Sequence, residues 1–142
     1  MERTVILIKP DAVKKGVIGH IITRLEKERF ILVAAKFIRL PEDLVEVWYE
    51  HHKDKPFFGE LKTFMTSTPI MAMLWQGEDV ITKVRKLAGP TDSKKAPKGT
   101  IRGDFGLDVQ QNAIHASEHY DAAKREMDLI FLPHDIHEYE RK

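Results

Sequence analysis

The chain has 142 residues, 42% of them hydrophobic and 32% charged, and its net charge is +1. These proportions exclude an intrinsically disordered or fibrous protein, and the length predicts one domain that spans residues 1–142. The lack of cysteine excludes disulfides and a cysteine metal site, and because no membrane-length apolar run or secretory cleavage pattern occurs, we expect no membrane partner and a cytoplasmic location.

The first half of the chain alternates apolar runs with helical patterns. Residues 4–8 are apolar and β-branched on both faces, which predicts a central strand. Apolar residues at helical spacing predict an amphipathic helix from residue 18 to about residue 28, and residues 30–40 follow as a second strand. Pro41 and Pro56 each suit the first position of a further helix.

The second half continues the alternation around one long loop. Residues 70–75 predict a third strand, and residues 80–88 predict a helix that Gly89 and Pro90 stop. Residues 88–99 then form a loop, and loops of this length in compact domains usually bind something. Residues 112–115 predict a short fourth strand and residues 120–127 begin a last helix, so the order indicates an α+β sandwich.

Basic residues are concentrated around this loop. Residues 83–102 contain seven basic side chains and one acidic side chain, a local charge of +6. A compact basic patch suits a small polyanion such as a nucleotide, and no specific nucleic-acid partner is expected. The alternative for Lys94, Lys95 and Lys98 is a solvated loop.

Phosphates would have to be held by side chains. The sequence contains neither a G-x-x-x-x-G-K-[ST] loop nor a G-x-G-x-x-G turn. Arg85, Thr91 and Arg102 flank the long loop, and the guanidinium group offers the paired donors that phosphate oxygens accept.

His115 is the candidate nucleophile. It ends a short apolar run, and the small residues Ala116 and Ser117 follow it, which predicts an exposed imidazole at the end of a buried element. A neutral ring nitrogen is nucleophilic near neutral pH, and a carboxylate on the other nitrogen, from Glu118 or Glu126, would fix the tautomer. The alternative is an ordinary hydrogen-bonded histidine.

Five ordered segments resemble the motif set of nucleoside diphosphate kinases, and the resemblance spans nearly the whole chain. The segments are IKPDAV (8–13), YEHHKDKPFF (49–58), RKLAGPTD (85–92), GTIRGDFG (99–106) and NAIHASE (112–118). The resemblance implies a ferredoxin-like βαββαβ antiparallel sheet with helices on one face, extra helices and a long loop. It also implies a homo-oligomer that uses Mg²⁺ with nucleoside tri- and diphosphates, and a ping-pong transfer of the γ-phosphoryl group through a phosphohistidine with broad base specificity.

The resemblance assigns catalytic roles position by position. His115 resembles the phosphorylated nucleophile and Glu126 the carboxylate that orients it, while Tyr49 and Ser117 resemble hydroxyls near the histidine. The common family pattern has Gly, Ser and Asp after the histidine, whereas this chain has Ala116, Ser117 and Glu118. Glu118 is therefore a metal candidate with a longer reach than Asp.

Substrate contacts follow from the same resemblance. Lys9 and Asn112 resemble the groups that bind the ribose 3′-hydroxyl, and Phe57, backed by Val109, resembles the ring that stacks on the base. His52 resembles a group that reaches an inner phosphate. The phosphate clamp is implied to consist of three side chains, namely Arg85, Thr91 and Arg102.

Two other classes of protein remain open from the residues. A helix through His115 and His119 would put both imidazoles on one face, as in a histidine-dependent zinc hydrolase, although the order differs from HExxH. The second alternative is a non-catalytic nucleotide-binding α+β module in which His115 is structural.

Overall fold

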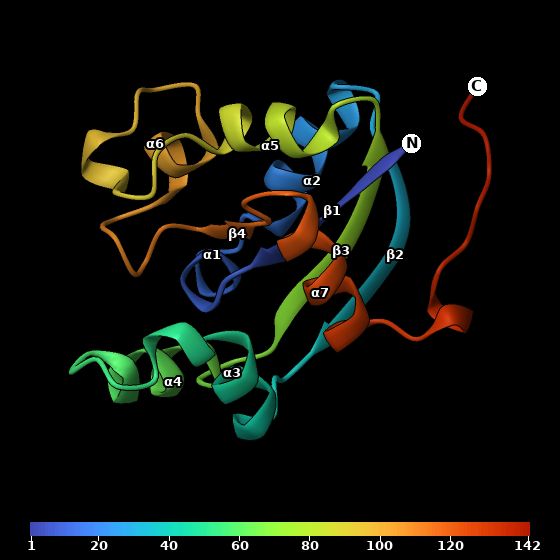
Figure 1. Cartoon of the computed structure of the whole chain (residues 1–142). Helices are drawn as coiled ribbons and strands as arrows, with labels where there is room; N and C mark the ends of the chain where they lie inside the picture. Colours follow the sequence, from blue (N-terminus) through green and yellow to red (C-terminus); the bar gives the residue numbers. More distant parts are fainter.

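The computed structural model describes all 142 residues, and its centre is a four-stranded antiparallel sheet (Figure 1). The strand order is β2-β3-β1-β4. The strands are β1 (Glu2–Ile8), β2 (Ile31–Ile38), β3 (Ile70–Gly77) and β4 (Ile114–Ala116). This order and the antiparallel pairing confirm the predicted ferredoxin-like α+β fold.

Strand β1 is central, as predicted, and is buried on both faces. Val5 and Leu7 point into one hydrophobic cluster and Ile6 and Ile8 into the other, because alternate side chains of a strand lie on opposite faces. All four side chains are 0% exposed. The strand pairs with β3 on one side and with β4 on the other, so it fixes the edge strand that carries His115.

One face of the sheet is covered by the helices that connect its strands. The helices on this side are α1 (Pro10–Lys15), α2 (Ile18–Lys27), α5 (Val80–Ala88) and α6 (Ile101–Phe105). Helix α2 buries Ile21 and Leu25, which are four positions apart. Helix α5 buries Ile81, Val84 and Ala88, which are three and then four positions apart, as on one face of an amphipathic helix.

The opposite face is covered by the extra helices. These are α3 (Glu42–Trp48), α4 (Phe58–Met65) and α7 (Tyr120–Ile130), which join the second hydrophobic cluster. The connecting helices α2 and α5 lie on one face, as the resemblance implied, but the molecule has helices on both faces. The physical reason is that β1 and β3 are apolar on both sides, so each side must be shielded from water.

Several boundaries differ from the sequence prediction. Helices α1 and α6 were not predicted, since six and five residues are too few to show a helical period. Helices α3 and α4 begin one or two residues after Pro41 and Pro56. Strand β4 begins at Ile114 rather than at residue 112, because Ala113 has a positive φ of 72° and cannot continue a strand.

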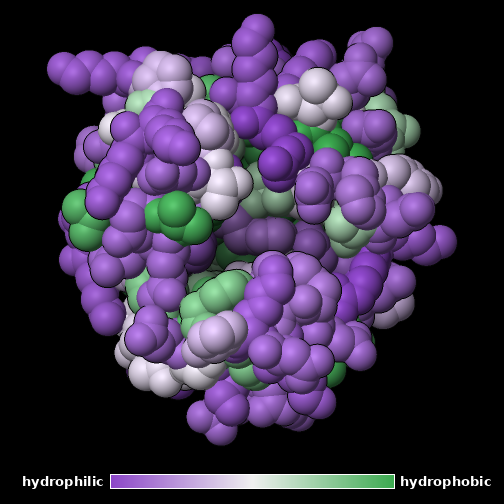
Figure 2. Space-filling view, turned by 60° about the vertical axis from the view of Figure 1, so that its left-hand side comes forward, coloured by the Kyte–Doolittle hydropathy of each residue, from purple (hydrophilic) through white to green (hydrophobic).

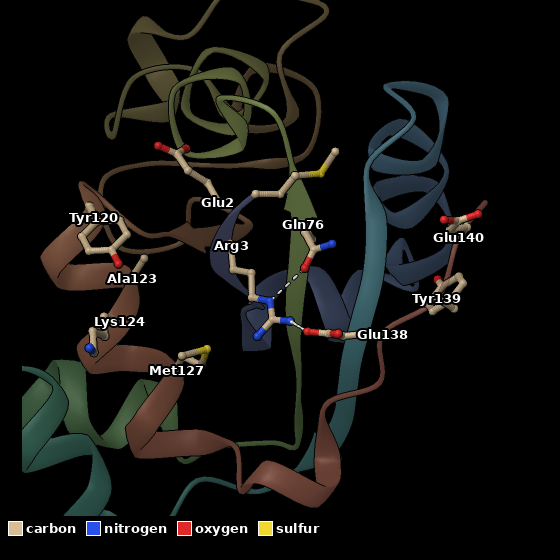
Figure 3. A pocket seen from close by; sticks show the side chains of 11 residues that line it. Glu2, Arg3, Gln76, Tyr120, Ala123, Lys124, Met127, Glu138, Tyr139 and Glu140 are labelled. Carbon is tan, nitrogen blue, oxygen red and sulfur yellow. Dashed lines mark hydrogen bonds and ion pairs between the residues drawn. The ribbon is translucent and has the colours of Figure 1, made fainter.

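Three short 3₁₀ helices complete the chain. They are η1 (Glu50–His52), η2 (Ser93–Lys95) and η3 (Pro133–Asp135), and η2 lies inside the predicted long loop. After η3 the C-terminal segment returns along the sheet, where Arg3 bonds both Gln76 and Glu138 (Figure 3). A cavity of about 780 Å³ lies between this segment and α7, and none of the predicted site residues lines it. No helix has the length and apolar character needed to cross a membrane.

Candidate active site

A cleft of about 890 Å³ lies between the α3–α4 hairpin and the segment that runs from α5 to β4. In Figure 1 the hairpin and the α5–α6 segment stand apart with β4 between them, and Figure 2 shows a hollow near the centre of the face that this side presents. Twelve of the thirteen predicted site residues line the cleft: Lys9, Tyr49, His52, Phe57, Arg85, Thr91, Arg102, Val109, Asn112, His115, Glu118 and Glu126.

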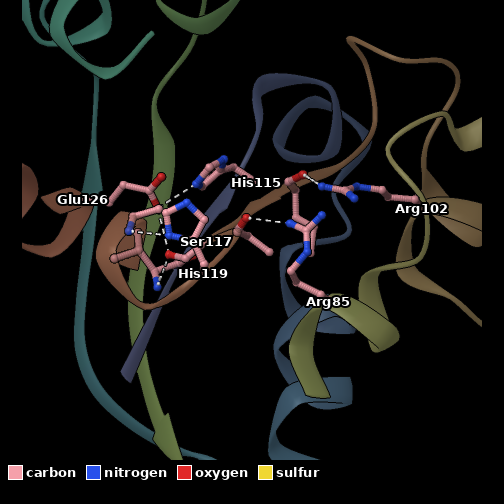
Figure 4. Close-up of polar contacts among 10 residues, drawn as sticks. Arg85, Arg102, His115, Ser117, His119 and Glu126 are labelled. Atoms are coloured by element: carbon pink, nitrogen blue, oxygen red, sulfur yellow. Dashed lines mark hydrogen bonds and ion pairs between the residues drawn. The ribbon is translucent and has the colours of Figure 1, made fainter. Parts of the chain in front are cut away.

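His115 lies in the middle of β4 and is held from α7. Its Nε2 is 2.9 Å from Oε1 of Glu126, and its side chain is 20% exposed (Figure 4). A carboxylate can only accept, so Nε2 carries the proton and Nδ1 is left with a free lone pair. The Trp48 ring packs against the imidazole in a T-shaped arrangement, at a centroid distance of 5.3 Å, which restricts rotation of the imidazole.

Ser117 is the one predicted site residue that does not line the cleft. It is fully buried, and its hydroxyl donates to Oε1 of Glu126 at 2.8 Å while accepting from the backbone N–H of Val5 at 3.0 Å. Ser117 therefore holds the carboxylate that holds His115. It makes no hydrogen bond to the histidine itself, so its part is to orient Glu126.

Lys9 and Asn112 converge, although 103 positions separate them in the sequence. Lys9 Nζ donates to Asn112 Oδ1 at 2.8 Å and to the carbonyl of Gln110 at 2.7 Å. The Asn112 amide donates in turn to the carbonyl of Thr91 at 3.0 Å. Burial lowers the pKa of Lys9 to about 8, and the carboxylate of Asp11 opposes that shift.

Two arginines brace the backbone on both sides of His115. Arg102 is 5% exposed and donates to the carbonyls of Gly89 and Ile114, at 2.9 and 3.0 Å. Arg85 donates to the carbonyl of Ala116 at 3.3 Å (Figure 4). Burial, and then the charge of Arg85, lowers the pKa of Arg102 to about 10, so the Arg102 guanidinium is still positive at neutral pH.

The remaining basic residues of the segment lie outside the cleft. Their side chains are exposed or half-buried, and none lines the cavity: Lys83, Lys86, Lys94, Lys95 and Lys98. The alternative of a solvated loop therefore holds for the loop lysines. The positive charge of the cleft comes from Lys9, Arg85, Arg102 and Arg125, and the carboxylates that line it are Glu118, Asp121 and Glu126.

Aromatic side chains form the mouth of the cleft. Phe57 is 42% exposed and Val109 is 58% exposed, so both present apolar surface to the opening of the cleft. The His52 ring lies 5.3 Å from the ring of Phe57 and 6.3 Å from that of Tyr49. Burial raises the pKa of the Tyr49 hydroxyl and lowers that of His52, with smaller contributions from neighbouring charges, so both groups are neutral at neutral pH.

The geometry contradicts the zinc-hydrolase alternative. His115 lies on a strand, whereas His119 caps the start of α7 by accepting from the backbone N–H of Ala122 at 3.1 Å. The two imidazoles therefore do not share a helix face. Glu118 is exposed in the cleft, and no group of three His, Asp or Glu side chains is placed to hold an ion. A single carboxylate suits a magnesium ion that is carried mainly by substrate phosphates.

Sequence reasoning missed several residues of this site. Trp48 was not marked as a site residue, and its side chain lies in the second cluster while its ring contacts that of His115. Gln110 and Arg125 line the cleft without any pattern that could have marked them. Asp11 accepts from the backbone N–H of Ala113 at 3.0 Å, and its place directly after the Lys9-Pro10 pair was the available signal.

These features define a class: ferredoxin-like α+β proteins with a histidine anchored by a carboxylate on the edge strand of a basic cleft. The family described as nucleoside diphosphate kinase matches residues 2–136. The chain belongs to the nucleoside diphosphate kinase family, and it is an enzyme that transfers phosphoryl groups between nucleotides.

The similarity extends over whole chains. The nucleoside diphosphate kinase of Halalkalibacterium halodurans is 47% identical over 141 residues, which are 99% of this chain and 96% of that protein. That of Saccharolobus islandicus is 46% identical over 136 residues, 96% of this chain and 99% of that protein. The structure of the Halobacterium salinarum nucleoside diphosphate kinase in complex with CDP is 46% identical and superposes with a TM-score of 0.96, covering 99% of this chain and 93% of that one.

Proposed function

We propose that the γ-phosphoryl group passes from a nucleoside triphosphate to Nδ1 of His115 and from there to a nucleoside diphosphate. The observation that carries the proposal is the 2.9 Å contact between Nε2 and Glu126, which commits one ring nitrogen to the protein and leaves the other free. His115 lies at the centre of the basic cleft, which favours a polyanionic substrate.

Each half-reaction balances at this site. The Nδ1 lone pair forms the N–P bond, the bond from phosphorus to the β,γ-bridging oxygen breaks, and its electron pair leaves with the diphosphate. The ring becomes cationic, and the Glu126 carboxylate, itself held by Ser117, compensates that charge. A second nucleoside diphosphate then attacks the phosphohistidine, and the same steps run in reverse.

The side chains around the cleft have separate tasks. Arg85, Thr91 and Arg102 hold the phosphates, with His52 near an inner phosphate, and Lys9 with Asn112 holds the sugar. Bound Mg²⁺ would be carried by the phosphate oxygens next to Glu118 and would neutralise part of their charge. Phe57, backed by Val109, holds the base by stacking, which accepts any base. The CDP in the structure of the Halobacterium salinarum relative is consistent with a pyrimidine at such a site.

A mass measurement tests the proposal. The chain is incubated with ATP and Mg²⁺ and without an acceptor, and we expect a gain of one phosphoryl group on His115, labile in acid. His115→Ala should lose the adduct, while His134→Ala, which alters a 76% exposed histidine outside the cleft, should keep it. An adduct of normal yield on the His115→Ala chain would contradict the assignment.

The homo-oligomer and the cytoplasmic location stay predictions. Light scattering of the purified chain tests the first, because a monomeric mass under assay conditions would contradict it.

A further inference from the structure

The residue that precedes β4 has a strained backbone. Ala113 has a φ of 72°, and the backbone N–H of Ile114 donates to the carbonyl of Asn112 at 2.9 Å. A hydrogen bond from residue i+2 to residue i with a positive φ between them is a γ-turn of the rare kind. A side chain with a Cβ disfavours this conformation, so the surrounding structure must hold it.

The turn is held from the start of α1. Oδ2 of Asp11 accepts from the backbone N–H of Ala113 at 3.0 Å, and the backbone N–H of Lys9 donates to the carbonyl of Ala113 at 2.9 Å. Ala113 is 0% exposed, so water cannot replace either bond. Each polar group of this one residue is thus bonded by a segment that lies more than a hundred positions away.

The Asp11 carboxylate lies in the first turn of α1 and interacts with the charge of Lys9, and one of its oxygens accepts from the turn at Ala113. Its second oxygen, Oδ1, is buried without a partner, and burial raises the pKa of the carboxyl. Desolvating a carboxylate is costly. Its side-chain hydrogen bond to another part of the chain goes to Ala113, which is the residue that needs to be held.

The turn separates two residues of the proposed site. Asn112 precedes it and is fixed by Lys9 and Thr91, while His115 follows it by two residues. Strand β4 has only three residues and lies at the edge of the sheet, so pairing with β1 alone gives it little rigidity. If Ala113 relaxed to a negative φ, the side chain of Asn112 would rotate relative to the imidazole.

We propose that Asp11 is a positioning residue for phosphoryl transfer, which holds the strained turn at Ala113 and so sets Asn112 relative to His115. The inference rests on the proposed role of His115. Displacements of about 1 Å in an active site can lower a rate by about a hundredfold, so the loss of this one acceptor is expected to affect the chemical step.

A double-mutant cycle tests the inference. Glycine adopts a positive φ without strain, so Ala113→Gly removes the need for an acceptor at Asp11. We expect Asp11→Ala to slow single-turnover phosphorylation of His115 by about a hundredfold in the natural background and much less in the Ala113→Gly background. Equal losses in the two backgrounds would overturn the inference.

Two controls separate this effect from others. Arg29 also has a positive φ, 67°, and lies outside the cleft, so Arg29→Gly should leave the loss caused by Asp11→Ala unchanged. Asp11→Asn loses the charge next to Lys9 but keeps an oxygen that can accept from Ala113, so it should remain within a few-fold of the natural rate. An Asp11→Asn variant as slow as Asp11→Ala would assign the effect to charge and overturn the inference.

The remaining outcomes are also decisive. If the alanine variant does not fold, Asp11→Ser replaces Asp11→Ala in the cycle. The serine side chain is shorter than that of aspartate, and serine suits the first turn of a helix. If the natural chain itself forms no phosphohistidine at His115, the proposed function fails. If it does form one and the cycle is additive, only the role of Asp11 fails.

Discussion

Glu126 contacts His115 at Nε2, the ring nitrogen farther from the backbone, at 2.9 Å. The contact joins α7 to β4, and the same carboxylate oxygen also accepts from the hydroxyl of Ser117. Nδ1 makes no hydrogen bond within the chain. The ring nitrogen of His115 that stays free is therefore set by a residue on another element, eleven positions further along the chain.

Glu126→Gln should slow phosphorylation of His115 about 10- to 100-fold, the usual cost of losing a partner that orients a histidine. A neutral amide cannot compensate the charge of the ring after attack, and its N–H can donate to Nε2, which moves the ring proton to Nδ1. Single-turnover transfer from ATP measures the effect. Asp128→Asn makes the same change at an exposed position of α7 and should leave the rate unchanged.

The fold was predictable where the sequence shows a long period. Strand β1 is apolar on both faces, and α2 and α5 have helical spacing. In these elements the buried positions are apolar, so the sequence shows which residues face the core. The turn at Ala113 has no signal in the sequence, because alanine normally avoids a positive φ and only hydrogen bonds to a distant part of the chain hold it there. Short elements such as α6 are also invisible to a periodic signal.

The site was predictable only through the resemblance of whole motifs. Periodicity reports which residues are buried, and it does not report that Lys9 meets Asn112 or that Arg102 reaches Ile114. Local charge pointed to the right segment, and the paired donors of guanidinium singled out Arg85 and Arg102, but neither signal shows which side chains enter the cleft. The distinction depends on which way α5 and α6 face, and this is decided by packing.

The pKa of Lys9 predicts an alkaline limit to activity. Its value of about 8 in the folded chain means that Lys9 loses its charge as the pH rises through 8. We therefore expect kcat/KM, which reports on the free enzyme, to fall through that region, and we expect a low and flat profile for Lys9→Gln. A natural profile that stays level up to pH 10 would show that the charge of Lys9 is not needed.

The same shift predicts a rise in stability at alkaline pH. The unfolded chain keeps the ordinary lysine pKa of 10.5, so between about 8 and 10.5 it binds more protons than the folded chain does. The contribution of Lys9 to the free energy of unfolding therefore increases with pH across this window. Comparing urea unfolding of the natural chain and Lys9→Gln isolates this contribution, which should be absent from the variant.

The exposed ring of Phe57 predicts a loss that is shared by all bases. Phe57→Ala should weaken purine and pyrimidine nucleotides together, by about 1 to 3 kcal/mol each, because stacking does not read the edges of the base. Nucleotide affinities measured by calorimetry give the comparison. Phe37→Ala removes a ring that is 55% exposed on β2 and serves as the control, whose affinities should not change.

Arg24 of α2 binds α6, the helix that carries Arg102. It pairs with Asp104 at 2.6 Å, donates to the carbonyl of Gly99 at 3.2 Å and lies over the ring of Phe105 at 4.7 Å. Arg24→Ala should loosen α6 and lower kcat/KM modestly, roughly two- to fivefold, since ion pairs in contact with water contribute little. Arg3→Ala breaks a pair of similar length with Glu138, away from the cleft, and should have no effect on kcat/KM.

The last prediction concerns the sugar. Lys9 Nζ and Asn112 Oδ1 are 2.8 Å apart, and we propose that both bind the ribose 3′-hydroxyl. A hydroxyl gripped between them would donate to the β,γ-bridging oxygen and stabilise the charge that develops as that bond breaks, so the substrate would supply part of the catalysis. We expect 3′-deoxynucleotides to phosphorylate His115 far more slowly than 2′-deoxynucleotides.

The magnitude follows from the number of bonds lost. Removing the 3′-oxygen deletes the bond to the bridging oxygen and also leaves Lys9 and Asn112 unpaired toward the substrate, and each charge-assisted bond is worth about 1.5 to 3 kcal/mol, roughly tenfold or more in rate. Single-turnover transfer from ATP, 2′-deoxy-ATP and 3′-deoxy-ATP at one Mg²⁺ concentration measures the difference. In Lys9→Gln the difference in rate between 2′-deoxy-ATP and 3′-deoxy-ATP should be smaller, because one of the groups that binds the hydroxyl has lost its charge. Equal rates for the two compounds on the natural chain would contradict the prediction, and the only contacts of Lys9 would then be those with Gln110 and Asn112.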